Sequence, residues 1–172
     1  LTQLSGLYAK KAGRAEVRNA NDATNDLQKG DLVFLDPPYS GVHYSRFYHV
    51  LETIAHGKCG SVSGSGRYPP PEERPRSSYS VGTESEAALD DLLKKIAEKE
   101  AKAILTFPQR PCSNGLSGTI VEETAAKYFK VKSTFKRSRF STLGGTKDAD
   151  GDGYGRAARQ KTHEMIFTLT PR

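Results

Sequence analysis

The feature that most constrains this chain is a four-residue apolar run, LVFL at residues 32–35, which lies between two aspartates and stops at two prolines. A run that is apolar at every position is typical of a strand buried on both faces, as in a parallel sheet. Pro37 and Pro38 end such a strand, because proline has no N–H to donate to a ladder. We therefore expect a sheet built around residues 32–35, with Asp36-Pro37-Pro38-Tyr39 at the carboxyl end of this strand.

Apolar residues elsewhere follow helical and strand spacings in turn. Helical spacing predicts three helices, over 44–56, 83–100 and 119–129. Apolar or alternating runs predict three further strands, over 103–107, 131–140 and 164–169. This succession is typical of a parallel α/β sheet, and the last two strands, with no helix between them, predict an antiparallel hairpin at one edge. In the helix over 83–100 we expect Thr83 or Ser85 to be the cap and four residues to form the buried stripe, namely Leu89, Leu92, Leu93 and Ile96.

Weaker patterns stand before the apolar run, and one long irregular segment follows it. Residues 1–11 predict a weak amphipathic helix, and residues 15–19 a short strand. Residues 57–83 are rich in Gly, Ser, Pro and Arg and predict a long loop, which in a compact domain is either functional or disordered. A chain of 172 residues has the size of one domain, so we expect a single domain over 1–172 in which this loop is mobile.

Composition excludes several classes of protein. No apolar run approaches the roughly 20 residues of a membrane span, and no signal peptide is recognisable, so we expect a cytoplasmic protein without membrane contact. The chain begins with Leu1 and not with Met, which predicts a fragment or a processed chain. Cys59 and Cys112 have neither disulfide nor metal spacing, and the four histidines form no ligand set. The segment from Asp148 resembles the start of a calcium loop but has Arg159 where a bidentate Glu is required, so we expect no metal.

A formal charge of +6 permits a polyanionic partner without proving one. The stretch with Arg67, Arg74 and Arg76, which also holds Tyr68 beside prolines, is the better DNA-binding candidate; otherwise it is a disordered insertion. A second basic run, Lys127–Arg139, would help on DNA through counterion release. For that run we favour the outer face of an edge strand, where lysines prevent aggregation.

The tetrapeptide at residues 36–39 joins three groups suited to holding a nucleobase. Two prolines stiffen the segment and fix the carbonyls of Asp36 and Pro37 in space. A carboxylate followed by a rigid carbonyl is a pair of acceptors, and an exocyclic amine has two N–H donors for them. Tyr39 supplies an aromatic face for stacking. In open α/β sheets ligands bind outside the carboxyl ends of the strands, which is where this tetrapeptide lies.

These residues resemble the S-adenosylmethionine-dependent amino-methyltransferases, whose catalytic motif is D/N/S-P-P-Y/F/W after the fourth strand. The version DPPY followed by SGVHYSRFYHVLE is most similar to the DNA adenine-N6 methyltransferases. The resemblance implies that Asp36 and the Pro37 carbonyl hydrogen-bond the target amine, that Pro38 belongs to the motif, and that Tyr39 stacks on the flipped adenine. It also implies direct methyl transfer without a metal or a covalent enzyme intermediate. Asn21-Asp22-Ala23 resembles the family's third motif, which gives Asp22 a contact with the cofactor adenine.

One part of the family pattern is missing. Cofactor binding requires a Gly-rich turn, FxGxG, after the first strand, and no glycine pair of this chain follows a strand and precedes a helix. The resemblance therefore implies a Rossmann-like sheet, mostly parallel with a C-terminal antiparallel hairpin, that lacks its first two strands. In the family order 3-2-1-4-5-7-6 the catalytic strand then becomes an open apolar edge. We expect a C-terminal part of a longer protein, a missing half supplied by another chain, or a third strand that has moved to pair with the catalytic strand.

The function indicated is methyl transfer to the N6 amine of adenine in DNA, of which this chain is the catalytic half. By itself we expect the chain to bind S-adenosylmethionine poorly or not at all and to be inactive. The nearest alternatives are the same fold acting on RNA or on cytosine N4. A chain without the glycine turn is alternatively a non-catalytic module that binds nucleic acid or a partner subunit.

Overall fold

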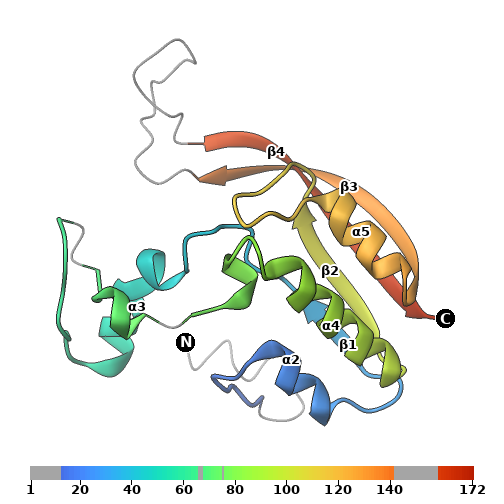
Figure 1. Cartoon of the computed structure of the whole chain (residues 1–172), viewed down its shortest axis with the longest axis horizontal. Coiled ribbons are helices and arrows are strands. Elements are labelled where there is room, and N and C mark those ends of the chain that lie inside the picture. The colour runs from blue at the N-terminus through green and yellow to red at the C-terminus, as the bar shows by residue number, and fades with distance from the viewer. Residues whose placement is uncertain (1–12, 66–67, 75, 142–158) are drawn as a thin grey trace, which may run out of the picture.

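The computed structural model describes residues 13–65, 68–74, 76–141 and 159–172. Its centre is a four-stranded sheet in the order β1-β2-β4-β3 (Figure 1). β1 (Leu32–Leu35) pairs in parallel with β2 (Lys102–Pro108), and β4 (Arg159–Pro171) pairs antiparallel with β2 and with β3 (Phe129–Ser141). The helices are α2 (Ala20–Ala23), α3 (Ser45–His56), α4 (Ser85–Glu98) and α5 (Gly118–Ala126). Single 3-10 turns are η1 (Thr24–Asp26), η2 (Pro71–Glu73) and η3 (Ser78–Ser80).

One face of the sheet is covered by α4 and α5, which lie side by side in Figure 1. Side chains alternate between the two faces of a strand, and every second residue of β2 and β4 is buried on this covered face. These residues are Ala103, Leu105, Phe107, Met165, Phe167 and Leu169. The predicted stripe of α4, Leu89, Leu92, Leu93 and Ile96, is buried against them. The core therefore lies between one sheet face and two helices.

The other face of the sheet, which we call the open face, is much less covered. Leu32 and Phe34 of β1 are each 66% exposed, although both belong to the apolar run. Lys102 and Thr168 on neighbouring strands are exposed as well, and Ile104 is half-buried. In the described part of the chain β1 also has no strand on its outer side, so the predicted open apolar edge is present.

Most predicted elements are confirmed with shifted ends. The apolar run forms β1 as predicted, and the three predicted helices become α3, α4 and α5. The hairpin strands are longer than predicted, because their outer residues pair only with each other. The order β1-β2-β4-β3 matches the 4-5-7-6 part of the order implied by the family resemblance.

Three expectations are wrong. Residues 15–19 form no strand, and they are exposed with no strand beside them in the described part of the chain. The four-stranded sheet is not mostly parallel, since it has one parallel and two antiparallel pairs. No side chain caps α4: its N-cap is Glu84, while the Ser85 hydroxyl donates instead to the Asn114 carbonyl, 2.7 Å away.

Several expectations lie outside the described residues. They concern the helix over 1–11, Arg67, and the calcium-like loop after Asp148. Residues 57–83 contain no long element in their described part, only η2, η3 and an isolated bridge between Ser63 and Tyr68. No described helix is long and apolar enough to span a bilayer.

Candidate active site

The tetrapeptide at the end of β1 presents its carboxylate to solvent and its prolines to the protein. Asp36 is exposed, Pro37 is buried, and Pro38 and Tyr39 are half-buried. The hydroxyl of Thr106 on β2 donates to Oδ1 of Asp36 at 3.0 Å. Thr106 lies between the buried Leu105 and Phe107 and so points to the open face. One carboxylate oxygen is thus held at the carboxyl end of the parallel pair, and no described residue donates to the other.

A buried amide holds the loop that follows the prolines. Asn114 is fully buried, and its Nδ2 donates to the Pro38 carbonyl at 2.8 Å and to the Tyr79 carbonyl at 2.9 Å. Its Oδ1 accepts from the Leu116 amide at 3.3 Å, so both ends of the side chain are used. The neighbouring Ser113 hydroxyl accepts from the Gly41 amide at 2.9 Å. The loop after β2 therefore fixes the backbone on both sides of Tyr39.

Pro37 differs from Pro38 in what its carbonyl contacts. Within the described residues nothing donates to the Pro37 carbonyl, whereas the Pro38 carbonyl is held by Asn114. The free Oδ2 of Asp36 and the Pro37 carbonyl are consequently two acceptors that remain available on a segment whose other groups are held. A ligand with two N–H donors on one nitrogen matches such a pair.

Aromatic side chains gather beside the carboxylate. The rings of Tyr44 and Tyr48 meet edge to face with centroids 5.8 Å apart. Burial, and then the neighbouring Tyr39 and Asp36, raises the pKa of Tyr44 to about 12. Burial also raises the pKa of Tyr39, with Glu164 and Asp36 adding to the effect. The phenols of Tyr39 and Tyr44 stay neutral at physiological pH. Tyr39 offers a partly buried ring next to the two acceptors that no described residue occupies.

A second carboxyl group, Glu164, stands on the same open face. It pairs in register with Pro108, two residues along β4 from the Ile166–Thr106 pair and therefore on the same face. Burial raises the pKa of Glu164, and the nearby Asp36 adds to the increase. Asp36, Thr106 and Glu164 thus come from three adjacent strands to one end of the sheet.

Comparison with known proteins identifies the family of this chain. The family model of the D12 class N6 adenine-specific DNA methyltransferases matches residues 2–107, more than half of the chain. The chain belongs to this family. It is also 32% identical over 97 residues to the modification methylase LlaI of Lactococcus lactis subsp. lactis. That alignment covers 56% of this chain but only 15% of the relative, so the chain spans far less than two thirds of the relative's length. The D12 match includes the tetrapeptide and ends at β2, before the β3–β4 hairpin.

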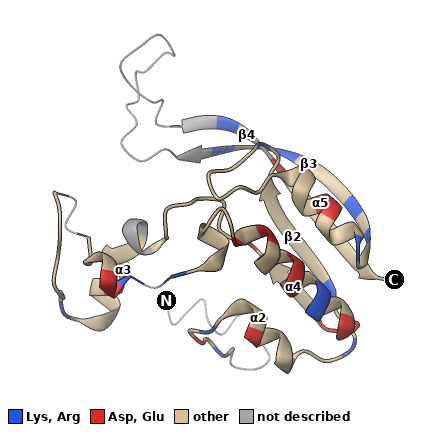
Figure 2. Ribbon diagram, viewed as in Figure 1, with Lys and Arg blue, Asp and Glu red and all other residues tan. Residues whose placement is uncertain are grey.

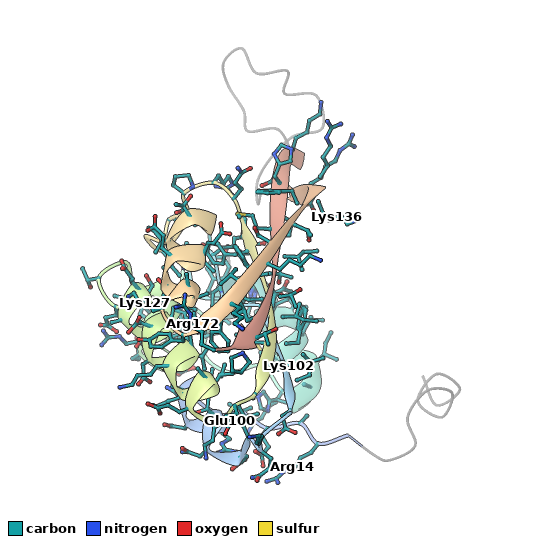
Figure 3. The ribbon with its side chains drawn as sticks, turned by 90° about the vertical axis from the view of Figure 1, so that its right-hand side faces the viewer. Arg14, Glu100, Lys102, Lys127, Lys136 and Arg172 are labelled. Atoms are coloured by element: carbon teal, nitrogen blue, oxygen red, sulfur yellow. The ribbon has the colours of Figure 1, made fainter. Side chains whose placement is uncertain are left out.

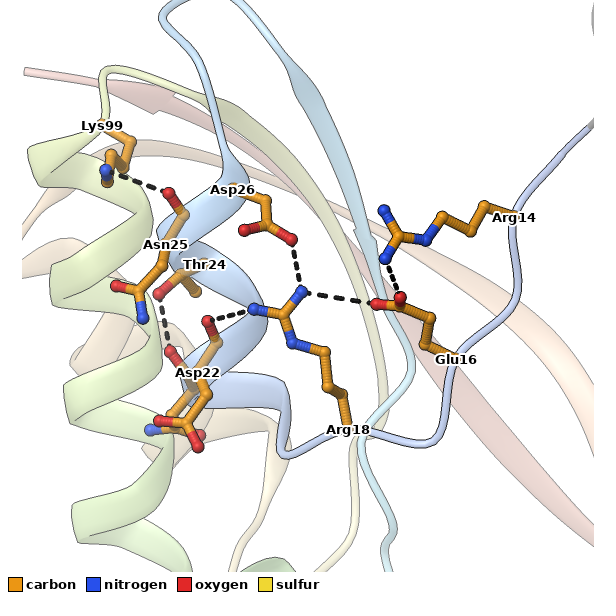
Figure 4. Close-up of polar contacts among 9 residues, drawn as sticks. Arg14, Glu16, Arg18, Asp22, Thr24, Asn25, Asp26 and Lys99 are labelled. Atoms are coloured by element: carbon orange, nitrogen blue, oxygen red, sulfur yellow. Dashed lines mark hydrogen bonds and ion pairs between the residues drawn. The ribbon is translucent and has the colours of Figure 1, made fainter.

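Asp22, for which the family resemblance implied a cofactor contact, lies on the short helix α2. It is exposed on α2, and its main-chain carbonyl accepts from Arg18 at 3.1 Å (Figure 4). Arg18 also pairs with Glu16 and Asp26 in this exposed cluster. The strand expected before Asp22 is absent, and the role of Asp22 toward a cofactor stays a prediction.

Asn21, the residue before Asp22, is the one that connects to the active site. Its Nδ2 donates to Asp91 at 2.7 Å and to the Ala88 carbonyl at 3.0 Å, both on α4. Its Oδ1 accepts from the Tyr79 hydroxyl at 2.6 Å. Tyr79 in turn is held at its carbonyl by Asn114, so one chain of hydrogen bonds runs from Asn21 to the Pro38 loop.

Two of the three arginines expected at DNA, Arg74 and Arg76, are engaged within the protein. Arg74 donates to the Pro69 carbonyl at 2.7 Å, and Arg76 pairs with Glu84 next to α4. Both contacts order the segment that leads into η3. Their role toward DNA stays a prediction. No cluster of three or more His, Cys, Asp or Glu side chains in the described ranges has the arrangement of a metal site.

Four residues of this D12 site were not among the sequence candidates: Thr106, Asn114, Glu164 and Tyr44. Thr106 and Glu164 stand in strands at positions where an apolar residue would be usual, and Asn114 follows the next strand along the sheet. The rule that loops at the carboxyl ends of neighbouring strands meet would have found Asn114. Glu164 could be placed only with the antiparallel register of β4 known.

Proposed function

We propose that this chain holds the target amine in a DNA methyltransferase that transfers a methyl group from S-adenosylmethionine to N6 of an adenine flipped out of duplex DNA. The observation that carries the proposal is the pair of free acceptors, Asp36 Oδ2 and the Pro37 carbonyl, on a segment held by Thr106 and Asn114. Membership in the D12 class supports DNA adenine as the substrate. It favours this substrate over the RNA and cytosine N4 alternatives.

The two acceptors would act on the amine in two ways. Each accepts one N–H of the exocyclic group, so both hydrogens are directed into the site and the nitrogen faces the incoming methyl group. The carboxylate also stabilises the positive charge that develops on the nitrogen as its bond to carbon forms. Tyr39 would stack on the adenine ring and hold it out of the helix. Pro38 keeps the segment rigid, so that the pair needs no rearrangement on binding.

The described residues do not by themselves fit S-adenosylmethionine. Asp22 is exposed on α2, and no glycine pair in the described ranges directly follows a strand, since Gly115 and Gly118 stand at the far end of the loop between β2 and α5. We therefore assign the donor's binding site to a part of the protein beyond the described residues, or to a second chain, that continues the sheet from the free edge of β1. In this proposal residues 1–172 are one catalytic subdomain, and the segment 57–83, with Arg67, Arg74 and Arg76, closes over DNA.

The test is methylation of duplex DNA by the full protein with Asp36→Ala. We expect at least a 100-fold loss of rate, a magnitude typical of losing a positioned group that acts on the reacting atom. Asp31→Ala is the matched control, because Asp31 precedes the other end of β1 and its carboxylate accepts from the Gln28 amide. Nucleoside mass spectrometry identifies the product. Full activity of Asp36→Ala, or N4-methylcytosine as the product, contradicts the proposal.

A non-catalytic module remains the second candidate, and the exposed position of Asp22 on α2 is what favours it. Equilibrium dialysis with labelled S-adenosylmethionine separates the two on the full protein. Binding supports the enzyme, and its absence together with absent methylation supports the module.

A further inference from the structure

The two strands of the C-terminal hairpin carry the whole net charge of the chain. β3 and β4 hold seven of the 26 basic residues and one of the 20 acidic residues. The remainder of the chain therefore has 19 of each sign. Figure 2 shows basic residues along β3 and near the outer end of β4. A positive charge concentrated in this way on one element is the kind of surface that attracts a polyanion.

One end of this hairpin extends beyond the sheet. The pairing of β4 with β2 ends at Glu164, whereas its pairing with β3 continues to Arg159. We call residues 136–141 and 159–163 the outer hairpin. It is two strands wide and contains five basic and no acidic residues. Figure 3 shows Lys136 near this end and Lys102 near the opposite end of the sheet.

The described residues do not neutralise the charges of the outer hairpin. Lys136, Arg137, Arg139 and Lys161 are all exposed, and in the described ranges none of them lies in an ion pair. Basic residues of the body behave differently. Several pair with a carboxylate, as Lys29 does with Glu100, Arg76 with Glu84, Lys95 with Asp91 and Lys127 with Asp90. The outer hairpin thus keeps its cations available.

The outer hairpin begins at the candidate active site. Glu164, the first residue of β4 that reaches the sheet, is close enough to Asp36 for the two charges to interact. The Gln109 amide donates to the His163 carbonyl at 2.9 Å, which joins the base of the outer hairpin to the loop after β2. That loop contains Asn114, which holds the tetrapeptide. A molecule that reaches Asp36 therefore passes near the base of the hairpin.

From this placement we propose that the outer hairpin binds the phosphate backbone of duplex DNA beside the flipped adenine. The inference rests on the proposed function, which brings DNA to Asp36. Arginines and lysines on a narrow two-stranded arm give contacts that position the duplex without reading its sequence. Protection of an edge strand accounts for Lys130 and Lys132, which lie where β3 borders the sheet, but it requires no arginines beyond the sheet.

The experiment measures binding of the full protein to duplex DNA as a function of salt. The outer variant is Arg137→Gln with Arg139→Gln, and the matched control is Lys130→Gln with Lys132→Gln. Both remove two charges at the same spacing from the same strand, and the strand register turns Arg137 and Arg139 to the side of the covered face but Lys130 and Lys132 to the open face. Each lost phosphate contact lowers the slope of log K against log salt by about one, so we expect the outer variant to lower it by about two. The control should leave the slope unchanged.

Three outcomes would overturn the inference. One is an unchanged slope in the outer variant, and another is an equal loss in both variants, which would indicate bulk charge only. The third is tighter binding of the wild-type protein to duplex RNA of the same sequence. The melting temperature verifies that the exposed substitutions leave the fold intact. A slope that falls by two while Asp36→Ala keeps full methylation would reject the proposed function and still support the hairpin as a DNA-binding arm.

Discussion

The two faces of the sheet are built from the same strands and differ in almost every other respect. On the covered face Leu105, Phe107 and Phe167 are completely buried beneath α4 and α5. On the open face Phe34 is 66% exposed, and the polar groups Asp36, Thr106 and Glu164 collect at the carboxyl end of the parallel pair. Alternate residues of one strand thus serve two purposes, because one set provides stability and the other provides the chemistry.

The sharpest test of this division compares two phenylalanines. Phe167→Ala removes a fully buried ring from the covered face, and we expect a loss of about 3–5 kcal/mol in the free energy of unfolding. Phe34→Ala removes a ring that is 66% exposed, so we expect a loss below about 1 kcal/mol. Urea denaturation followed by circular dichroism measures both. Equal losses would mean that the open face is covered in solution.

The next effect concerns Asn114, whose side-chain amide holds the segments of Pro38 and Tyr79. Asn114→Ala removes donors to the Pro38 and Tyr79 carbonyls and leaves both without them. We expect a loss of about 2–3 kcal/mol, from hydrogen bonds worth about 1 kcal/mol each and the exposed or unsatisfied carbonyls. Methylation should fall further than stability alone explains, because the segment that carries Tyr39 loses its anchor. Ser113→Ala, which removes a hydroxyl that accepts only from Gly41, is the milder control.

Packing on the covered face also leaves no room at the start of α5. A Cβ added at Gly118 would lie 2.2 Å from Sδ of Met165 and 3.0 Å from Cα of Gln109. We expect Gly118→Ala to destabilise the protein by about 1–3 kcal/mol, the usual cost of overpacking. Gly60→Ala is the control, since its nearest neighbour would be the end of the Glu73 side chain at 3.8 Å. If Met165→Ala in the Gly118→Ala background does not restore part of the loss, the clash with sulfur is not its cause.

The division of the faces also explains which features the sequence could predict. The helices followed from apolar spacing, since the stripe of α4 meets the covered face and is buried. The apolar run predicted that residues 32–35 form a strand, and they form β1. It did not predict that Leu32 and Phe34 are exposed, because an apolar run implies packing on both faces and the described residues cover only one face. The strand predicted over 15–19 is absent for a related reason, because such a pattern forms a strand only where a neighbouring strand pairs with it.

The candidate site was predictable only where its chemistry is continuous in sequence. Asp36-Pro37-Pro38-Tyr39 could be found because four adjacent residues carry the whole pattern. Thr106, Asn114 and Glu164 come from two other strands and a loop, and only the register brings them together. At residues 21–23 the motif did not indicate which residue makes the contacts seen in the structure. The resemblance pointed to Asp22, whereas the contacts that join this segment to the site are made by Asn21.

The smallest effect that we predict concerns the stability that the fold loses by keeping Glu164 on the open face. Burial and the nearby Asp36 raise the pKa of Glu164 above its ordinary value of 4.5. The folded state therefore holds the proton more tightly than the unfolded chain does. The resulting contribution to stability is complete below the ordinary pKa and is lost as the pH rises through the raised value. At neutral pH the ionised Glu164 therefore destabilises the folded state, and Glu164→Gln removes this destabilisation.

We accordingly expect Glu164→Gln to melt at a slightly higher temperature than the wild type at pH 7, with the difference vanishing as the pH falls below about 4. Glu123→Gln, at an exposed position of α5, controls for the loss of one negative charge. A difference that stays constant with pH, or a lower melting temperature at pH 7, would show that Glu164 is not strained by its surroundings. If the variant is more stable but methylates more slowly, the carboxylate is kept for function at the expense of stability, as active-site groups often are.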